Sequence, residues 1–179
     1  MNILFIGNSY TYFNDLPAVF SALANENGKH VTAHSVTRGG RKLNQFMDTE
    51  DDCTKELGCV LADNPPYDAV FMQEQSLLPA LDHDAFLSGV TFVKRMADTR
   101  TDRFILYTTW ARKLGSPDLD THGWSRVRMT LLLDESYRRA GKALDIPVSP
   151  VGINFWKVIS AHPELDLHAP DLSCSFRVY

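Results

Sequence analysis

The chain has 179 residues, of which 44% are hydrophobic and 22% charged, and its formal net charge is −4. This composition is that of an ordinary soluble globular protein, long enough for one domain with a full core. The negative balance gives no electrostatic reason to expect nucleic acid or a membrane surface as a partner, and no apolar stretch approaches the roughly 20 residues that span a bilayer.

The N-terminus and the cysteines bear on compartment and cofactors. Met1 is followed almost at once by an apolar run, so the sequence shows no signal peptide and we expect a cytoplasmic chain by default. The three cysteines, Cys53, Cys59 and Cys174, are an odd number without a CxxC pair. A disulfide framework or a zinc ribbon is therefore not expected, and we predict no metal and no other cofactor.

Short apolar runs alternate with helical patterns along the chain. Residues 2–7 (NILFIG) predict a strand buried on both faces. A helix is predicted over residues 16–27, with Asp15 as its cap and Gly28 as its end. Residues 30–36 alternate between apolar and polar, which predicts a weaker strand near a sheet edge.

The same alternation continues to residue 152. Further strands are predicted over residues 67–73, 103–110 and 146–152. Further helices are predicted over residues 52–63, 82–98 and 119–144. About five strands alternating with helices predict an α/β protein: a three-layer αβα sandwich around a doubly wound parallel sheet. We expect a single domain over residues 1–179, with a ligand at the carboxyl ends of the strands.

A polar turn follows the first strand at that edge of the sheet. It reads Asn8-Ser9-Tyr10-Thr11, after a glycine, Gly7, that allows close backbone approach. Such a turn can connect strand to helix, hold an anion, or present Ser9 as a nucleophile near the positive end of the next helix. The turn alone leaves these three interpretations open.

Two further stretches follow the second and third predicted strands. Gly39 and Gly40 in RGGRKL (38–43) form either a flexible loop or a nest of backbone N–H groups that can bind an oxyanion. Gln73 and Gln75 in FMQEQS (71–76) are either exposed loop residues or amide donors to the same oxyanion. All of these residues are predicted at the edge that carries Ser9.

These blocks, taken in order, resemble those of the SGNH (GDSL-type) hydrolase superfamily of serine esterases. FIGNSYTYFNDLP (5–17) is similar to the opening block of a largely uncharacterised SGNH-like branch, and RGGRKL and FMQEQS fall in the second and third block positions. IPVSPVGINFWKVI (146–159) resembles the strand and helix that lead into the last block. The resemblance implies a flavodoxin-like sandwich that hydrolyses small esters, such as O-acetyl groups on carbohydrate.

The resemblance also implies roles for single residues. Ser9 is the nucleophile, and its N–H, the Gly40 N–H and a side-chain amide form the oxyanion hole. The family's Gly-x-Asn block places Gln73 at the Gly position and Gln75 at the Asn position, so Gln75 is the preferred donor. Asn8 is expected on the substrate side.

The last block departs from the family's Asp-x-x-His. By the resemblance, PDLSCSF (170–176) has Asp171 at the Asp position but Cys174 at the His position, and we expect the family's usual C-terminal helix to be lacking. Three explanations are open. Cys174 is a real substitution in a decayed enzyme, His168 serves as a substitute base, or the tail is cut short or out of frame relative to the family.

The alternative function is that of a non-catalytic binding module. A flavodoxin-like domain holds phosphate or flavin in a hydroxyl-rich turn such as the one at Ser9. A carbohydrate-binding pseudoenzyme is the second form, and Trp110 either stacks on its sugar or packs in the core. In every case the expected partner is a small-molecule ester or carbohydrate, with neither nucleic acid nor membrane, and the sequence leaves the oligomeric state undefined.

Overall fold

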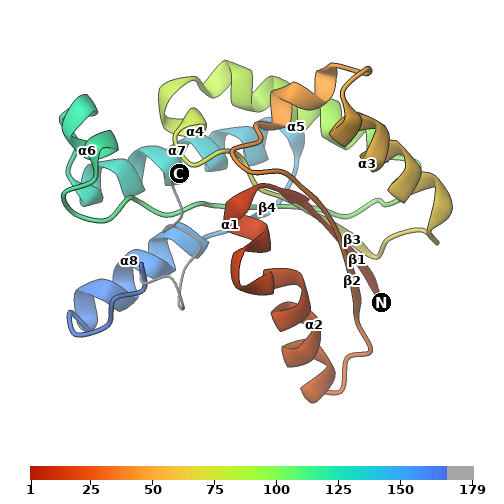
Figure 1. Ribbon diagram of the computed structural model, residues 1–179, viewed down its shortest axis with the longest axis horizontal. Helices are drawn as coiled ribbons and strands as arrows, with labels where there is room; N and C mark the ends of the chain where they lie inside the picture. Colours follow the sequence, from red (N-terminus) through yellow and green to blue (C-terminus); the bar gives the residue numbers. More distant parts are fainter. Residues whose placement is uncertain (169–179) are drawn as a thin grey trace.

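The computed structural model describes residues 1–168 and consists of one sheet with helices on both faces (Figure 1). The five strands are all parallel, in the order β2-β1-β3-β4-β5. They are β1 (Asn2–Gly7), β2 (Thr32–Thr37), β3 (Ala69–Met72), β4 (Phe104–Tyr107) and β5 (Val148–Ser149). The predicted α/β sandwich is confirmed, and the alternating segment 30–36 lies at the sheet edge as β2.

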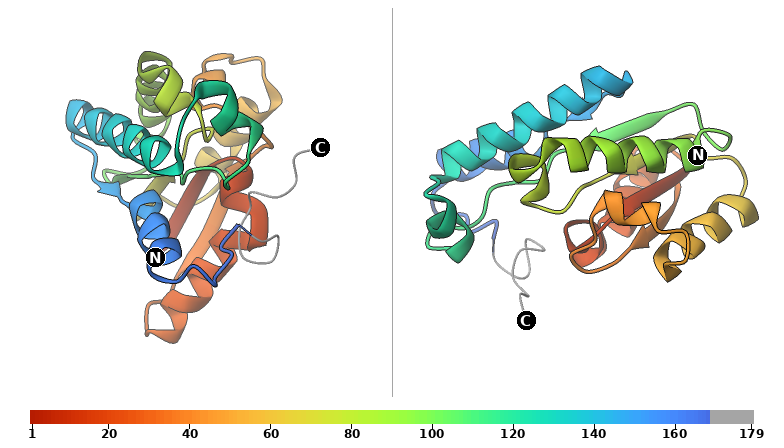
Figure 2. Two further views of the ribbon diagram at one scale, coloured as in Figure 1. Left: turned by 90° about the vertical axis from the view of Figure 1, so that its left-hand side faces the viewer. Right: turned by 90° about the horizontal axis from the view of Figure 1, so that it is seen from above.

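Helices form the two outer layers (Figure 2). On one face lie α3 (Asp52–Asp63), α5 (His83–Ala97) and α7 (Arg126–Leu144), and on the other α2 (Leu16–Glu26) and α8 (Val151–Ala161). Shorter elements are α1 (Ser9–Tyr12), α4 (Leu78–Leu81), α6 (Pro117–His122), and the 3₁₀ helices η1 (Phe13–Asp15) and η2 (Leu43–Met47). No helix within residues 1–168 is long and apolar enough to cross a membrane.

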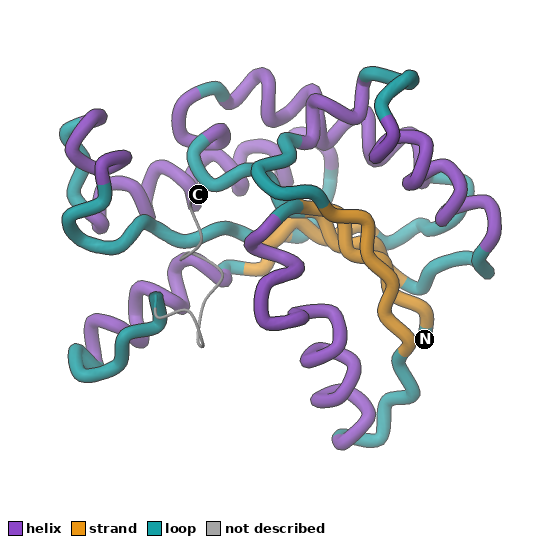
Figure 3. Tube along the Cα trace, in the orientation of Figure 1, coloured by secondary structure: helices purple, strands orange, loops and turns teal. Residues whose placement is uncertain are grey.

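The central strand β1 shows why this chain forms a covered sheet. Leu4 and Ile6 belong to the larger core cluster, while Ile3 and Phe5 belong to the cluster on the opposite face. All four side chains are almost completely buried. A strand covered on both faces needs apolar residues at successive positions, which is why the run NILFIG does not alternate. Figure 3 shows the strands bundled between the two helical layers.

The predicted helix over residues 119–144 is divided in the structure. α6 ends at His122 and is capped by Gly123, whose φ of 62° lies in the left-handed region that glycine adopts without strain. α7 begins after Ser125, whose side chain accepts a hydrogen bond from the Arg128 N–H. A left-handed C-cap followed by a serine N-cap ends one helix and starts another, so the prediction of one continuous helix was wrong.

The predicted strand over residues 146–152 is shorter in the structure. β5 has only two residues, and α8 begins at Val151. The reason is the pair Pro147 and Pro150, which flank β5 and have no N–H to donate to a neighbouring strand. The short strand nevertheless brings α8 to the carboxyl end of β4.

Candidate active site

The turn after β1 places Ser9 at the carboxyl edge of the sheet. Asn8 caps α1 by accepting a hydrogen bond from the Tyr10 N–H at 3.1 Å, and Ser9 is the first residue of that helix. The Ser9 side chain is half-buried, and among residues 1–168 none hydrogen-bonds to its hydroxyl. Gly7 is required, because a Cβ there would lie 2.4 Å from Thr11 Oγ1. The tightly packed turn therefore presents the Ser9 hydroxyl at the edge of the sheet.

A buried amide network fixes this turn to the neighbouring strand β3. The Oε1 of Gln73 accepts hydrogen bonds from the Asn8 N–H at 3.2 Å and from Thr11 Oγ1 at 2.9 Å. Its Nε2 donates to Asn8 Oδ1 at 3.0 Å and to the Glu74 carbonyl. Both amide protons of Gln73 thus already have acceptors within the Ser9 turn and its neighbouring strand end. The oxyanion-donor role of Gln73 stays a prediction that its present contacts do not favour.

The Gly39–Gly40 turn after β2 is bound to the Ser9 turn from the other side. The Arg38 N–H donates to the Gly7 carbonyl at 3.4 Å, and Asn8 Nδ2 donates to the Arg41 carbonyl at 2.9 Å. The turn closes with a hydrogen bond from the Arg41 N–H to the Arg38 carbonyl at 3.1 Å, and Gly40 has a φ of 65°. The Asn8 amide therefore binds the Arg41 carbonyl, and the predicted contact of Asn8 with substrate stays a prediction.

Arg41 holds the far side of the same turn. Its guanidinium lies 2.7 Å from Asp51 Oδ1 and donates to the Gln45 carbonyl at 2.9 Å. The hydrogen bond from Arg41 lowers the pKa of Asp51 from 3.8 to about 2. Arg41 is only 8% exposed, so the ion pair with Asp51 holds a nearly buried positive charge next to the glycine turn.

At the end of β3 the structure reveals an acidic residue that sequence reasoning passed over. Glu74 is completely buried, and burial raises its pKa from 4.5 to about 8. Gln75 is half-buried, and its Oε1 accepts hydrogen bonds from the N–H groups of Leu77 and Leu78 at 2.8 and 3.0 Å. Its Nε2 donates to Ser76 Oγ at 3.3 Å. The only sequence signal for Glu74 was a charge directly after an apolar strand.

Aromatic residues line the carboxyl end of β4. The Trp110 ring stacks on Phe155 of α8 at 5.0 Å and lies 4.5 Å from the Tyr10 ring. Trp110 is only 9% exposed, so the structure places most of its ring in packing contacts. Arg112 reaches the same group, donating to the Tyr10 hydroxyl at 3.2 Å and to Asp118 at 2.7 Å. The sugar-stacking role of Trp110 stays a prediction.

His168 returns to this end of the sheet from the tail. It is 2% exposed, its ring lies 4.9 Å from Phe155, and its Nε2 is 3.0 Å from the Ala111 carbonyl. Because a carbonyl only accepts, Nε2 carries the proton and Nδ1 the lone pair. Burial lowers the pKa of His168. Within residues 1–168 no hydrogen bond joins His168 to Ser9.

The segment before His168 is tied to the loop after β4. Lys113 Nζ lies 2.5 Å from Asp166 Oδ2, and the His168 N–H donates to Asp166 Oδ1 at 3.2 Å. The other two predicted residues of the last block, Asp171 and Cys174, lie outside the described residues. The structure thus brings the blocks after β1, β2 and β3 together and places His168 near the end of β4.

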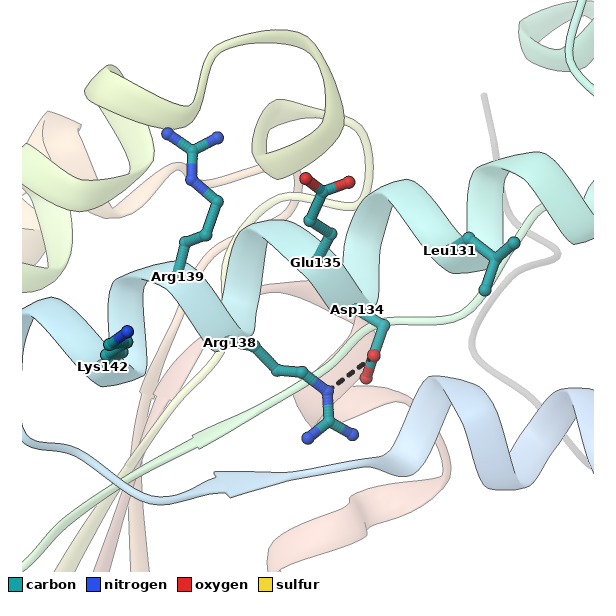
Figure 4. Close-up of a pocket in the computed structure, with 6 residues that line it drawn as sticks. All are labelled: Leu131, Asp134, Glu135, Arg138, Arg139 and Lys142. Atoms are coloured by element: carbon teal, nitrogen blue, oxygen red, sulfur yellow. Dashed lines mark hydrogen bonds and ion pairs between the residues drawn. The ribbon is translucent and has the colours of Figure 1, made fainter.

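A separate hollow lies on the outer face of α7 (Figure 4). All its lining residues belong to that helix: Leu131, Asp134, Glu135, Arg138, Arg139 and Lys142. Two of these residues form an ion pair of 2.6 Å, between Arg138 Nε and Asp134 Oδ2 (Figure 4). The hollow contains none of the predicted site residues. Elsewhere within residues 1–168, no group of three or more His, Cys, Asp or Glu side chains is arranged as a metal-binding site.

Comparisons with known proteins agree with the geometry. No protein-family model matches the sequence, and no curated protein matches it. Among solved structures, a candidate SGNH hydrolase from Slackia heliotrinireducens is 26% identical, with a TM-score of 0.77 over 88% of this chain and 82% of that one.

More distant structures share the fold. A DUF4886 family protein from Bacteroides uniformis is 15% identical, with a TM-score of 0.69 over 85% of this chain and 67% of that one. A variant of an acetyl-xylooligosaccharide esterase from Geobacillus stearothermophilus is 13% identical, with a TM-score of 0.63 over 93% and 84% of the two chains. At these identities the likeness shows a common architecture.

Proposed function

We propose that this chain, which belongs to the SGNH (GDSL-type) hydrolase superfamily, is a serine esterase in which Ser9 is the nucleophile. The observation that carries this proposal is the Ser9 turn itself. Ser9 is half-buried, and its hydroxyl has no hydrogen-bond partner among residues 1–168. The turn is hydrogen-bonded to the segments that follow both neighbouring strands. A nucleophile held rigidly at the carboxyl edge of a parallel sheet can attack a bound ester carbonyl.

We propose an oxyanion hole at the carboxyl edge of the sheet, beside the Ser9 turn. We assign the N–H groups of Ser9 and Gly40 and the side-chain amide of Gln75. The hydrogen bonds from Arg38 to Gly7 and from Asn8 to Arg41 support this choice, because they hold the glycine turn beside the Ser9 turn. Gln75 is preferred to Gln73, whose two amide protons already have acceptors. Such donors stabilise the charge that develops on the carbonyl oxygen.

The reaction needs a base for the Ser9 proton. Ser9 Oγ attacks the ester carbonyl, the base takes the hydroxyl proton, the alcohol leaves, and water then releases the acyl group. By resemblance, Asp171 and Cys174 occupy the positions of the family's Asp and His. We therefore propose an enzyme that is slow because a thiol replaces the imidazole. His168, whose Nδ1 lone pair is not used for Ala111, is the substitute base in this chain.

The proposed substrate is a small acyl ester, such as an O-acetyl group on a carbohydrate. Its support is the fold shared with an acetyl-xylooligosaccharide esterase and the aromatic residues beside the Ser9 turn, Tyr10 and Trp110. A carbohydrate-binding pseudoenzyme on the same scaffold is the second candidate. The cysteine at the family His position favours it, and glycan binding without turnover would identify it.

Covalent labelling tests whether Ser9 is the nucleophile. Diethyl p-nitrophenyl phosphate is expected to place one diethyl phosphoryl group on Ser9, with release of one p-nitrophenolate per chain. Mass spectrometry of the peptide that contains Ser9 measures the adduct, and the Ser9→Ala variant is the blank. Labelling elsewhere, or none, would contradict the proposal.

The Gly40→Ala variant tests the glycine turn. Gly40 has a φ of 65°, where a side chain costs about 1–2 kcal/mol, and relief of that strain moves the N–H. We expect the rate of Ser9 phosphorylation to fall by about 10-fold to 100-fold, up to the size expected for losing an oxyanion donor. Gly28→Ala is the matched control, because Gly28 has a φ of 74° and open space around it, away from the site. Equal rates for the two variants would refute the role of the turn.

A further inference from the structure

The buried carboxyl group of Glu74 lies where the third block meets the second. Both of its oxygens are 3.1 Å from the Leu43 nitrogen, and Oε1 also accepts a hydrogen bond from the Gln75 N–H at 2.6 Å. Glu74 is 0% exposed, and within residues 1–168 no cation forms an ion pair with it. Ionising a buried carboxyl group without a cation is costly, so the presence of a carboxyl group at this position calls for a function.

We propose that Glu74 is a positioning residue that fixes the segment 38–43, and with it the Gly40 N–H, to the end of β3. The inference rests on the proposed function, in which Gly40 stabilises the oxyanion. Leu43 lies three residues after Gly40, and Glu74 is its tether to β3. The backbone tethers of the segment at Arg38 and Arg41 lead to the Ser9 turn instead, while the guanidinium of Arg41 binds Asp51 and the Gln45 carbonyl. The carboxyl group thus joins two halves of one oxyanion hole.

The surroundings of Leu43 leave no substitute for this contact. Leu43 is 1% exposed, so water does not reach it freely. On its other side α5 approaches so closely that a Cβ on Gly89 would lie 2.7 Å from the Leu43 carbonyl carbon. Without the carboxyl group, the Leu43 N–H would be a buried donor with no acceptor. The segment would then have to move to satisfy it, and Gly40 would move with it.

Titration of Glu74 offers a way to observe the tether. Burial raises the pKa of Glu74 to about 8, while the charge of Lys42 and the N–H groups of Leu43 and Gln75 act to lower it. From α7 the Tyr137 hydroxyl accepts the Glu74 N–H at 3.0 Å, and burial raises the pKa of Tyr137 well above its usual value. The folded state favours neutral Glu74, so this contribution to stability is complete below about pH 4.5 and is lost as the pH rises through about 8.

Amide NMR tests the tether without any need for activity. In the wild-type chain the Leu43 and Gly40 cross-peaks are expected to shift together, with a midpoint near pH 8. In Glu74→Gln, which keeps a carbonyl acceptor, neither cross-peak should titrate. In Glu74→Ala, the exchange of the Leu43 amide with solvent should accelerate by about 10-fold or more. A Gly40 cross-peak that is unchanged in all three proteins would overturn the proposal.

The rate of Ser9 phosphorylation then separates positioning from mere stability. Glu74→Ala is expected to react about 10-fold more slowly, and Glu74→Gln within about threefold of the wild type, with Glu135→Gln on the exposed face of α7 as control. A wild-type rate in folded Glu74→Ala would overturn the positioning role. If Glu74→Ala does not fold, the test is the pH dependence of the phosphorylation rate. The same pH dependence in the wild type and Glu74→Gln would overturn the positioning role. If even the wild type fails to react, the proposed function fails, and the cross-peaks still decide whether Glu74 holds the segment.

Discussion

Exchanging Cys174 for histidine is expected to raise kcat/KM for p-nitrophenyl acetate by about 10³-fold, the typical contribution of a general base. A free cysteine has a pKa of about 8.5 and is mostly thiol at neutral pH, so it is a poor acceptor for the Ser9 proton. Imidazole titrates near neutrality and takes the proton readily. By the resemblance stated above, Asp171, three residues earlier, is the proposed residue that orients the base. Steady-state kinetics at neutral pH measure the gain.

The control is a cycle with Ser9. Because nucleophile and base act as a unit, Ser9→Ala should cost about 10³-fold or more in the Cys174→His background and far less in the native one. Cys59→His, on the exposed side of α3, is the matched exchange and should change nothing. A gain that survives Ser9→Ala would show that the new histidine acts on its own. No gain at all would favour the carbohydrate-binding pseudoenzyme.

His168, the proposed substitute base of the native chain, is tested in the same series of variants. Its replacement by alanine should remove the residual native rate, whereas in Cys174→His it should matter little. Thermal unfolding must accompany the measurement, because His168 is buried against Phe155 and Ala111. A residual rate that survives in folded His168→Ala would assign the remaining activity to the oxyanion hole alone.

The fold was predictable because its determinants are local. Apolar runs of strand length and the cap at Asp15 are each visible within a few residues. The prediction of one helix over 119–144 failed because the local sequence signal there is ambiguous. The pattern over 119–144 is amphipathic throughout, and only the left-handed φ of Gly123 shows that the chain turns there.

The position of the Ser9 turn was predictable for the same reason, but its frame was not. Gln73 and Asn8 are 65 residues apart, and their reciprocal contact depends on the pairing of β1 with β3. Glu74 belongs to FMQEQS, but its role was not predictable, because nothing in the sequence shows that the Leu43 N–H would meet its carboxyl group. The burial of His168 likewise depends on Ala111, 57 residues earlier. Tertiary contacts decide which polar residues act on substrate and which hold the site.

Replacing Gly152 by alanine is expected to destabilise the chain by about 3 kcal/mol, the upper part of the range for overpacking. Gly152 is the second residue of α8 and lies against the end of β4. A Cβ there would be 2.1 Å from the Thr109 carbonyl oxygen and 3.2 Å from Thr108 Oγ1. The first of these is backbone and cannot rotate away. Helix α8 must therefore move, which strains the hydrogen bond of 2.7 Å from the Gly152 N–H to Thr108 Oγ1.

Thermal unfolding measures this effect as a fall in Tm of roughly 10 °C. Gly58→Ala is the matched control, because Gly58 lies on the exposed side of α3 with no atom within 4 Å of the added Cβ. That variant should be more stable by about 0.5–1 kcal/mol, since alanine favours the helix. Equal Tm values for the two variants would show that α8 is not held against β4. Because Thr109 leads directly into Trp110 and Ala111, the contacts of Phe155 and His168 should loosen in Gly152→Ala as well.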